Sequence, residues 1–197
     1  MPDSTSESLA RTYERLWSCL ESGVSAQRSP FTMLQAATLG IDGAPKVRTI
    51  VLRQVSRADR VLSFHTDARS EKVAELRRDP RIALVANDLD ALVQIRVEGV
   101  ASICDDAQRR AIWQSSRPHT LLLYRAPLPP GTPVESPEAA HVPASQRAEP
   151  SGDGYENFCL LHVTATRIDW LELARSGHRR AVFDLHAGGY DGRWIAP

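Results

Sequence analysis

The chain has 197 residues, 42% of them hydrophobic, and its 24 basic residues balance 24 acidic ones. This net charge of zero argues against a general nucleic-acid or membrane-surface binder, and no run approaches the ~18 apolar residues of a membrane span. The three cysteines lie far apart without CxxC spacing, which predicts neither a metal site nor a disulfide framework. Because the polar, acidic start also lacks a signal-peptide pattern, we expect a cytoplasmic protein of one domain, residues 1–197.

The N-terminal part predicts an amphipathic helix followed by antiparallel hairpins. Residues 6–24 carry apolar side chains at helical spacing, which is typical of a helix packed on a core. These side chains are Leu9, Tyr13, Leu16, Trp17 and Leu20. We expect strands over residues 31–39, 47–54 and 61–66, joined by polar turns, of which Asp42-Gly43 is the strongest signal.

A short helix is expected over residues 70–78, where Val73 and Leu76 face inward and Lys72 and Glu75 face solvent or a ligand. Strands over residues 81–86 and 91–104 come next. The second strand alternates between polar and apolar residues, and Gly99 within it predicts a bulge or a close approach of two backbones.

The C-terminal part begins with a helix from Asp105 through Trp113 and a leucine-rich helix over residues 120–125. Residues 127–154 contain seven prolines and few apolar anchors, which favours an extended excursion. We interpret it as a surface loop; a lid or an arm to a second subunit is the alternative.

Strands are then expected over residues 158–173 and 178–185. The apolar end, Trp194 to Pro197, is expected to dock on the barrel or on a dimer interface.

Two neighbouring segments carry the main functional signal. Arg48-Thr-Ile-Val-Leu-Arg53 is predicted as a strand, and Phe64-His-Thr-Asp-Ala-Arg-Ser-Glu-Lys72 leaves a strand and enters a helix. A helix start exposes free backbone N–H groups and the positive end of a dipole, which suits a phosphate. Because basic residues and hydroxyls of both segments can gather there, we predict a cradle for a phosphorylated ligand.

The same two segments resemble the flavin-binding segment of the pyridoxamine 5'-phosphate oxidase family. Gln94, His178-Arg179-Arg180 and the closing Trp194-Ile-Ala-Pro197 are also similar to motifs of that family. The resemblance implies a mainly β fold, a six-stranded antiparallel split β-barrel with flanking helices that binds FMN. It further implies a homodimer with flavin sites at the subunit interface and a small-molecule substrate.

The resemblance also implies roles for individual residues. The phosphate would be held by Arg48, Lys72 and Arg69 with the hydroxyls of Thr66 and Ser70. The ring edge would meet the backbone of the first segment and the amide of Gln94. The implied cofactor-binding set is Arg48, Thr49, Ile50, Val51, Leu52, Arg53, His65, Thr66, Arg69, Ser70, Lys72 and Gln94. The implied substrate-binding set is Arg53, Trp113, Arg117 and Arg179. No catalytic residue is identified.

The chain departs from the family pattern mainly around the vitamin phosphate. Glu71 replaces a basic residue at the helix start, and Trp113 and Leu121 stand where the family has Tyr and Ser, so that Arg117 alone survives. The family's late histidine is replaced by Ala181. We therefore expect this chain to retain the family's flavin-binding residues better than its substrate-binding residues, as in a divergent subfamily.

We predict an FMN-binding oxidoreductase that resembles pyridoxamine/pyridoxine 5'-phosphate oxidase and whose substrate is either that of the family or a diverged one. A flavin-dependent reductase of another small molecule and a non-catalytic FMN binder on the same barrel are the alternatives. An oligonucleotide-binding barrel is disfavoured by the zero net charge and the few aromatic residues on strands.

Overall fold

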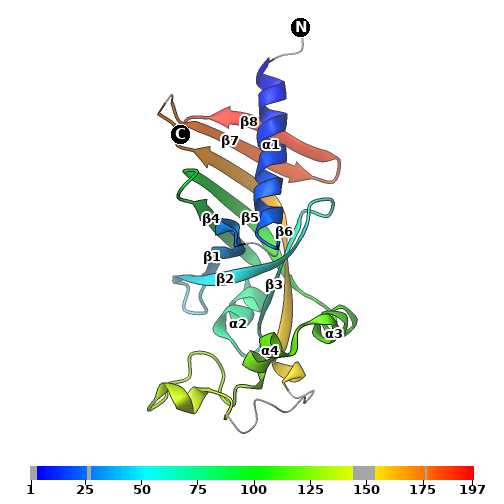
Figure 1. Ribbon diagram of the computed structural model, residues 1–197, viewed down its shortest axis with the longest axis vertical. Coiled ribbons are helices and arrows are strands. Elements are labelled where there is room, and N and C mark those ends of the chain that lie inside the picture. Colours follow the sequence, from blue (N-terminus) through cyan, green and yellow to red (C-terminus); the bar gives the residue numbers. More distant parts are fainter. Residues whose placement is uncertain (1–3, 26–27, 144–153, 176) are drawn as a thin grey trace.

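The computed structural model of the chain describes residues 4–25, 28–143, 154–175 and 177–197. Within these residues, eight strands form one antiparallel sheet in the order β3-β2-β1-β4-β5-β6-β7-β8 (Figure 1). The strands are β1 (Met33–Leu39), β2 (Pro45–Ser56), β3 (Val61–Asp67), β4 (Arg81–Asp88), β5 (Val93–Ile103), β6 (Phe158–Glu172), β7 (Arg179–His186) and β8 (Gly189–Ile195). The helices are α1 (Ser4–Ser22), α2 (Glu71–Arg78), α3 (Asp106–Ser115) and α4 (Pro118–Leu121), with 3-10 turns η1 (Pro30–Thr32), η2 (Leu122–Arg125), η3 (Pro137–Ala140) and η5 (Tyr155–Asn157).

Strand β6 turns this sheet into a split barrel. Its first part, Phe158 to Thr164, pairs with β3 and closes a ring of six strands, β1-β2-β3-β6-β5-β4. Its last part, Arg167 to Glu172, leaves the ring and pairs with β7, while β5 follows it on the other edge. The expected six-stranded antiparallel split barrel is confirmed, and β5 and β6 extend from it into the sheet that β7 and β8 complete.

Gly99 permits the bend at which β5 and β6 leave the ring. The register of the two strands shifts between Glu98 and Gly99. A Cβ atom at Gly99 would lie 2.6 Å from the backbone oxygen of Thr164, closer than real Cβ contacts allow. The bulge and the close backbone approach expected from the sequence are therefore both present, and they explain why glycine stands here.

Helix α1 packs its predicted apolar stripe on β7 and β8, at the end of the molecule away from α2 (Figure 1). Leu16, Trp17 and Leu20 are fully buried, and the Tyr13 ring stacks on Tyr190 with centroids 3.9 Å apart. The C-terminus therefore does more than dock as an apolar end, since it forms strand β8 along β7. Among the described residues, no helix is long and apolar enough to cross a membrane.

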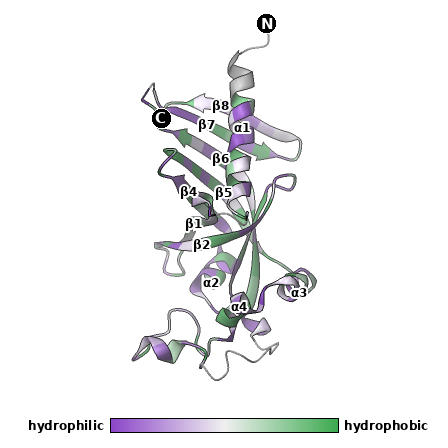
Figure 2. Ribbon diagram, viewed as in Figure 1, coloured by the Kyte–Doolittle hydropathy of each residue, from purple (hydrophilic) through white to green (hydrophobic). Residues whose placement is uncertain are grey.

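Helix α2 and a cluster that involves α3 and α4 lie at the other end of the barrel. Helix α2 carries both hydrophobic and hydrophilic residues (Figure 2), and its Val73 and Leu76 side chains are buried, as expected. A second, small hydrophobic cluster packs Phe158 and Leu160 of β6 and Tyr124 against side chains of α3 and α4. The expected helix over residues 120–125 is divided between α4 and the 3-10 turn η2. Residues 144–153 of the proline-rich excursion lie outside the described residues.

Candidate functional site

The start of α2 brings three of the predicted cradle residues together. Ser70 is the N-cap residue, but its hydroxyl donates to the backbone oxygen of Asp67 at 2.7 Å instead of capping the helix. The Lys72 Nζ donates to the Thr66 hydroxyl at 3.0 Å and to the Ser70 hydroxyl at 3.1 Å. An ammonium group with two hydroxyl neighbours at a helix start is a suitable environment for an anion.

The charge of Lys72 is incompletely compensated. Burial lowers the pKa of Lys72, and the positive charge of Arg48 lowers it further, while Asp67 and Glu75 act in the opposite direction. Within the described residues, no ion pair joins Lys72 to a carboxylate; its hydrogen bonds go to the two hydroxyls. A half-buried cation in this state is stabilised when an anion binds beside it.

Arg48 lies on the inward face of β2, at the barrel end beneath α2. Its NH2 group forms an ion pair with the Glu75 Oε2 at 2.7 Å, and its NH1 group donates to the Thr38 hydroxyl. The Thr38 hydroxyl also donates to the Glu75 Oε2 at 2.6 Å. Of the two orientations expected for Glu75, the one toward solvent is wrong, because this side chain is 2% exposed and bonded to Arg48 and Thr38. We call Arg48, Thr66, Ser70 and Lys72 the Lys72 cluster.

Arg69 is already hydrogen-bonded to groups outside the Lys72 cluster. Its guanidinium donates to both carboxylate oxygens of Asp67, at 3.0 and 2.8 Å, and to the backbone oxygen of Ala126 at 3.1 Å. The hydrogen bond to Asp67 is the largest influence that raises the pKa of Arg69. As a phosphate contact, Arg69 therefore differs from Lys72, because an anion would compete with a carboxylate already bound to it.

A second group of predicted residues lies on the outer side of β2 and β3. Arg53 is exposed at the register shift between β2 and β3, and its charge acts on both His65 and Tyr124. Burial, and then Arg53, lower the pKa of His65 to about 4, so the imidazole is neutral at physiological pH. The His65 ring meets the edge of Phe158 with centroids 5.1 Å apart, and Trp113 packs on Phe158 at 5.4 Å.

The remaining residues of the predicted strand segment divide between the two faces of β2. Ile50 and Leu52 are buried in the barrel core, whereas Thr49 is exposed and Val51 is half-buried. Their backbone is the part that the sequence interpretation assigned to contacts with a flavin ring.

Gln94 does not adjoin the Lys72 cluster. It pairs with Leu171 near one end of β6, whereas Thr66 pairs with Cys159 near the other end. The Gln94 amide donates to Asn87 at 3.0 Å. Within one chain, Gln94, the predicted ring contact, and Thr66 of the predicted phosphate site therefore lie beside opposite ends of β6.

The other predicted substrate residues are not gathered into one pocket. Arg117 is exposed at the start of α4, and Arg179 is exposed and pairs with Glu172 at 3.3 Å. Trp113 alone lies in the aromatic cluster beside His65. In the described residues, no group of three His, Cys, Asp or Glu side chains is arranged to hold a metal ion.

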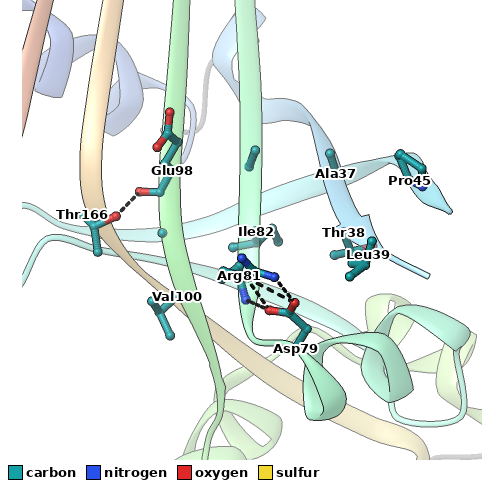
Figure 3. A pocket seen from close by; sticks show the side chains of 12 residues that line it. Ala37, Thr38, Leu39, Pro45, Asp79, Arg81, Ile82, Glu98, Val100 and Thr166 are labelled. Atoms are coloured by element: carbon teal, nitrogen blue, oxygen red, sulfur yellow. Dashed lines mark hydrogen bonds and ion pairs between the residues drawn. The ribbon is translucent and has the colours of Figure 1, made fainter. Parts of the chain in front are cut away.

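A groove of ≈ 550 Å³ runs over the outside of the barrel where β1, β4 and β5 lie side by side (Figure 3). Figure 3 shows the Asp79–Arg81 ion pair on its wall and the hydrogen bond from Thr166 to the backbone of Glu98. Thr38 lines this groove and also bonds Glu75, so the groove reaches the partners of Arg48.

The sequence interpretation did not include Thr38 and Tyr124 in the site, and it left Glu75 facing either solvent or a ligand. Glu75 follows Lys72 by three positions on α2, a spacing that places both side chains on one side of a helix. That spacing was the available signal. Thr38 and Tyr124 are brought to the site by strand pairing and loop packing, for which the sequence carries no local mark.

The solved structures of related proteins share the fold. A pyridoxamine 5'-phosphate oxidase-related, FMN-binding protein from Nostoc punctiforme superposes with a TM-score of 0.70 over 100% of both chains, at 24% identity. PhzG from Burkholderia lata, solved with tetrahydrophenazine-1-carboxylic acid, gives a TM-score of 0.73 at 17% identity and covers 100% of this chain and 94% of that one.

Sequence comparison identifies relatives as well. Pyridoxine/pyridoxamine 5'-phosphate oxidase 2 of Arabidopsis thaliana is 27% identical over 79% of this chain and 80% of its own length. The oxidase of Thermosynechococcus vestitus is 36% identical over 51% of this chain, a match that spans 46% of that protein. Residues 14–105 match the family described as pyridoxamine 5'-phosphate oxidase, FMN-binding domain. This match spans slightly less than half of the chain and contains β1 to β5 and the whole Lys72 cluster. These residues are therefore similar to the FMN-binding domain of the pyridoxamine 5'-phosphate oxidase family, whose cofactor is FMN.

Proposed function

We propose that this protein is an FMN-dependent oxidoreductase that holds the FMN phosphate at the Lys72 cluster. The observation that carries the proposal is the Lys72 ammonium, which contacts two hydroxyls at the start of α2 beside Arg48. A dianionic phosphate would supply the negative charge that this group lacks. The residues present thus fit the phosphate of the family's cofactor.

When bound, FMN supplies the chemistry of hydride and electron acceptance, and the chain's own residues bind and orient it. The backbone of residues 49–53 offers N–H and C=O groups for the ring edge. Arg53 and the neutral His65 lie on the outer side of the same strands, beside Trp113 and Tyr124. We assign this aromatic, singly cationic surface to substrate binding.

We further propose that the protein works as a homodimer. The outer face of β1, β2 and β5 exposes large apolar side chains, including Met33 at 57%, Val47 at 68% and Val100 at 44%. Large apolar side chains exposed on one face of a sheet favour association with a partner. A dimer would also explain why Gln94 lies far from the Lys72 cluster of its own chain, since Gln94 or Arg179 of a second copy can approach a flavin that the first copy binds.

The substrate is proposed to differ from pyridoxamine 5'-phosphate. Arg117 is exposed, and Trp113 packs among Tyr124, Tyr155 and Phe158 where the family pattern has a polar residue. A substrate phosphate held by one exposed arginine lacks the several hydrogen bonds that such a group needs. This arrangement favours a flatter, less polar substrate, and it keeps a reductase of another molecule and a non-catalytic binder as alternatives.

The visible spectrum of the purified protein tests the cofactor, and flavin absorption that persists through gel filtration is the expected result. A colourless protein that binds no added FMN would contradict the proposal. Steady-state oxygen uptake by the FMN-loaded protein then tests the substrate. We expect turnover of pyridoxamine 5'-phosphate well below a kcat/KM of ~10⁴ M⁻¹s⁻¹, the lower range for enzymes on their own substrates.

A further inference from the structure

The Lys72 cluster has a built-in negative charge at Glu75. The carboxylate of Glu75 is 2% exposed, and one of its oxygens accepts hydrogen bonds from Arg48 and Thr38, at 2.7 and 2.6 Å. Its charge also acts on the pKa of Lys72. A buried carboxylate in this position is costly unless it is paired, so its presence in a phosphate site requires an explanation.

We propose that Glu75 is a positioning residue that holds Arg48 at the barrel end and sets the net charge that a phosphate meets there. The proposal rests on the assignment of the FMN phosphate to the Lys72 cluster. Arg48 and Lys72 contribute two positive charges and Glu75 removes one, which leaves a net charge of +1. The nearby Asp67 and Arg69 neutralise each other through their own ion pair at 2.8 Å.

This arrangement has two consequences with opposite signs. Without a bound phosphate, Glu75 stabilises the protein because it pairs with the part-buried Arg48. With a phosphate bound, Glu75 opposes it as a like charge. Glu75 thus weakens phosphate binding and keeps the ligand-free barrel end intact, whereas a residue with a purely structural role would support both states equally.

The variant Glu75→Gln separates these roles. Its amide oxygen can still accept from Arg48 and Thr38, but the charge is gone. The dissociation constants of FMN and of riboflavin, which lacks the phosphate, are measured by flavin fluorescence for each variant. We expect the preference for FMN over riboflavin to rise about tenfold in Glu75→Gln, because one nearby like charge is removed. The melting temperature of the flavin-free protein should fall.

A matched control is Glu98→Gln, which removes an exposed carboxylate from β5 and should leave the preference unchanged. A preference that stays the same or falls in folded Glu75→Gln would overturn the proposal.

A second pair of variants decides the matter if Glu75→Gln does not fold. Arg48→Gln lowers the net charge of the site to zero, and the double variant Arg48→Gln/Glu75→Gln returns it to +1. The preference for FMN should fall in the single variant and recover towards the wild-type value in the double variant. If it falls but does not recover, the phosphate site stands and the role of Glu75 is wrong. If neither Arg48→Gln nor Lys72→Gln changes the preference, the phosphate site itself is wrong.

Discussion

Two regions of this protein place two cations close together, and they compensate the charge differently. At the split end of the sheet, Arg96 and Arg180 both bind the Asp169 carboxylate, at 2.5 and 2.8 Å. At the barrel end, Glu75 pairs with Arg48, while Lys72 turns to the hydroxyls of Thr66 and Ser70. We call the first region the Asp169 cluster.

We interpret the charges of the Asp169 cluster as structural, and the Lys72 cluster is the proposed ligand site. Asp169 is 7% exposed and lies on the strand between the two that carry its arginines, so its ion pairs tie β5, β6 and β7 together. The ammonium of Lys72 has donors in excess of acceptors, and an added anion would complete its surroundings. The comparison therefore predicts that the Asp169 cluster governs stability and the Lys72 cluster governs flavin binding.

The largest effect is expected for Asp169→Ala. This change leaves Arg96 and Arg180 without their shared carboxylate, and breaking a part-buried pair of this kind should cost about 2–4 kcal/mol of unfolding free energy. Urea denaturation of the flavin-free protein measures it. Asp184→Ala is the matched control, because Asp184 also pairs with two arginines but its side chain is 41% exposed, so the loss should be small. Equal losses in both variants would refute the structural role of the Asp169 cluster.

Next in size is the effect of Lys72→Ala and Arg48→Ala on FMN binding. Each change removes one charge-assisted contact to the phosphate, which should cost about 1.5–3 kcal/mol of binding free energy. Fluorescence titration with FMN measures the change. Lys46→Ala removes a lysine that is paired with Asp42 at the surface and should bind FMN like the wild type. Unchanged affinity in both cluster variants would show that the phosphate lies elsewhere.

Much of the fold could be predicted from the sequence because its signals are local. The alternation along β5, the stripe of α1 and the glycine at the β5 bulge each follow from the chemistry of neighbouring residues. The strand β8 was not predicted. Its residues, Gly189 to Ile195, include two glycines and a charged pair and carry no local strand pattern, so only their pairing with β7 makes them a strand.

The site was predictable only in part, for the same reason. Thr66, Ser70 and Lys72 lie within one short segment, so their meeting follows from a strand that leads into a helix. The partners of Arg48 come from β1 and α2 and depend on the closed barrel. The resemblance to the family identified Arg48 but not Glu75, the carboxylate that pairs with it.

A smaller effect is expected from His65 as the pH is lowered. Its pKa of about 4 lies below the ordinary value of 6.5, so the unfolded chain takes up this proton first. The stabilisation is complete above pH 6.5 and is lost as the pH falls towards 4. Because the ring is partly exposed, we expect a loss of about 1–2 kcal/mol. His65→Phe should remove this part of the pH dependence. If the unfolding free energies of the wild type and the variant fall by the same amount between pH 7 and pH 4, the lowered pKa of His65 is wrong.

The smallest effect is expected in the proline-rich excursion. Its described part holds the 3-10 turn η3 among exposed residues, and Val142, 6% exposed, is its buried apolar residue. Replacing residues 129–141 with a Gly/Ser linker of equal length removes little buried surface and should change the unfolding free energy by less than about 1 kcal/mol. Val142→Ser, which places a hydroxyl in the buried position, should cost more than the whole replacement. Thermal melts of the two flavin-free variants rank them. The reverse order would mean that residues 129–141 pack as structure, and that the excursion contributes to the barrel end where Arg69 contacts Ala126.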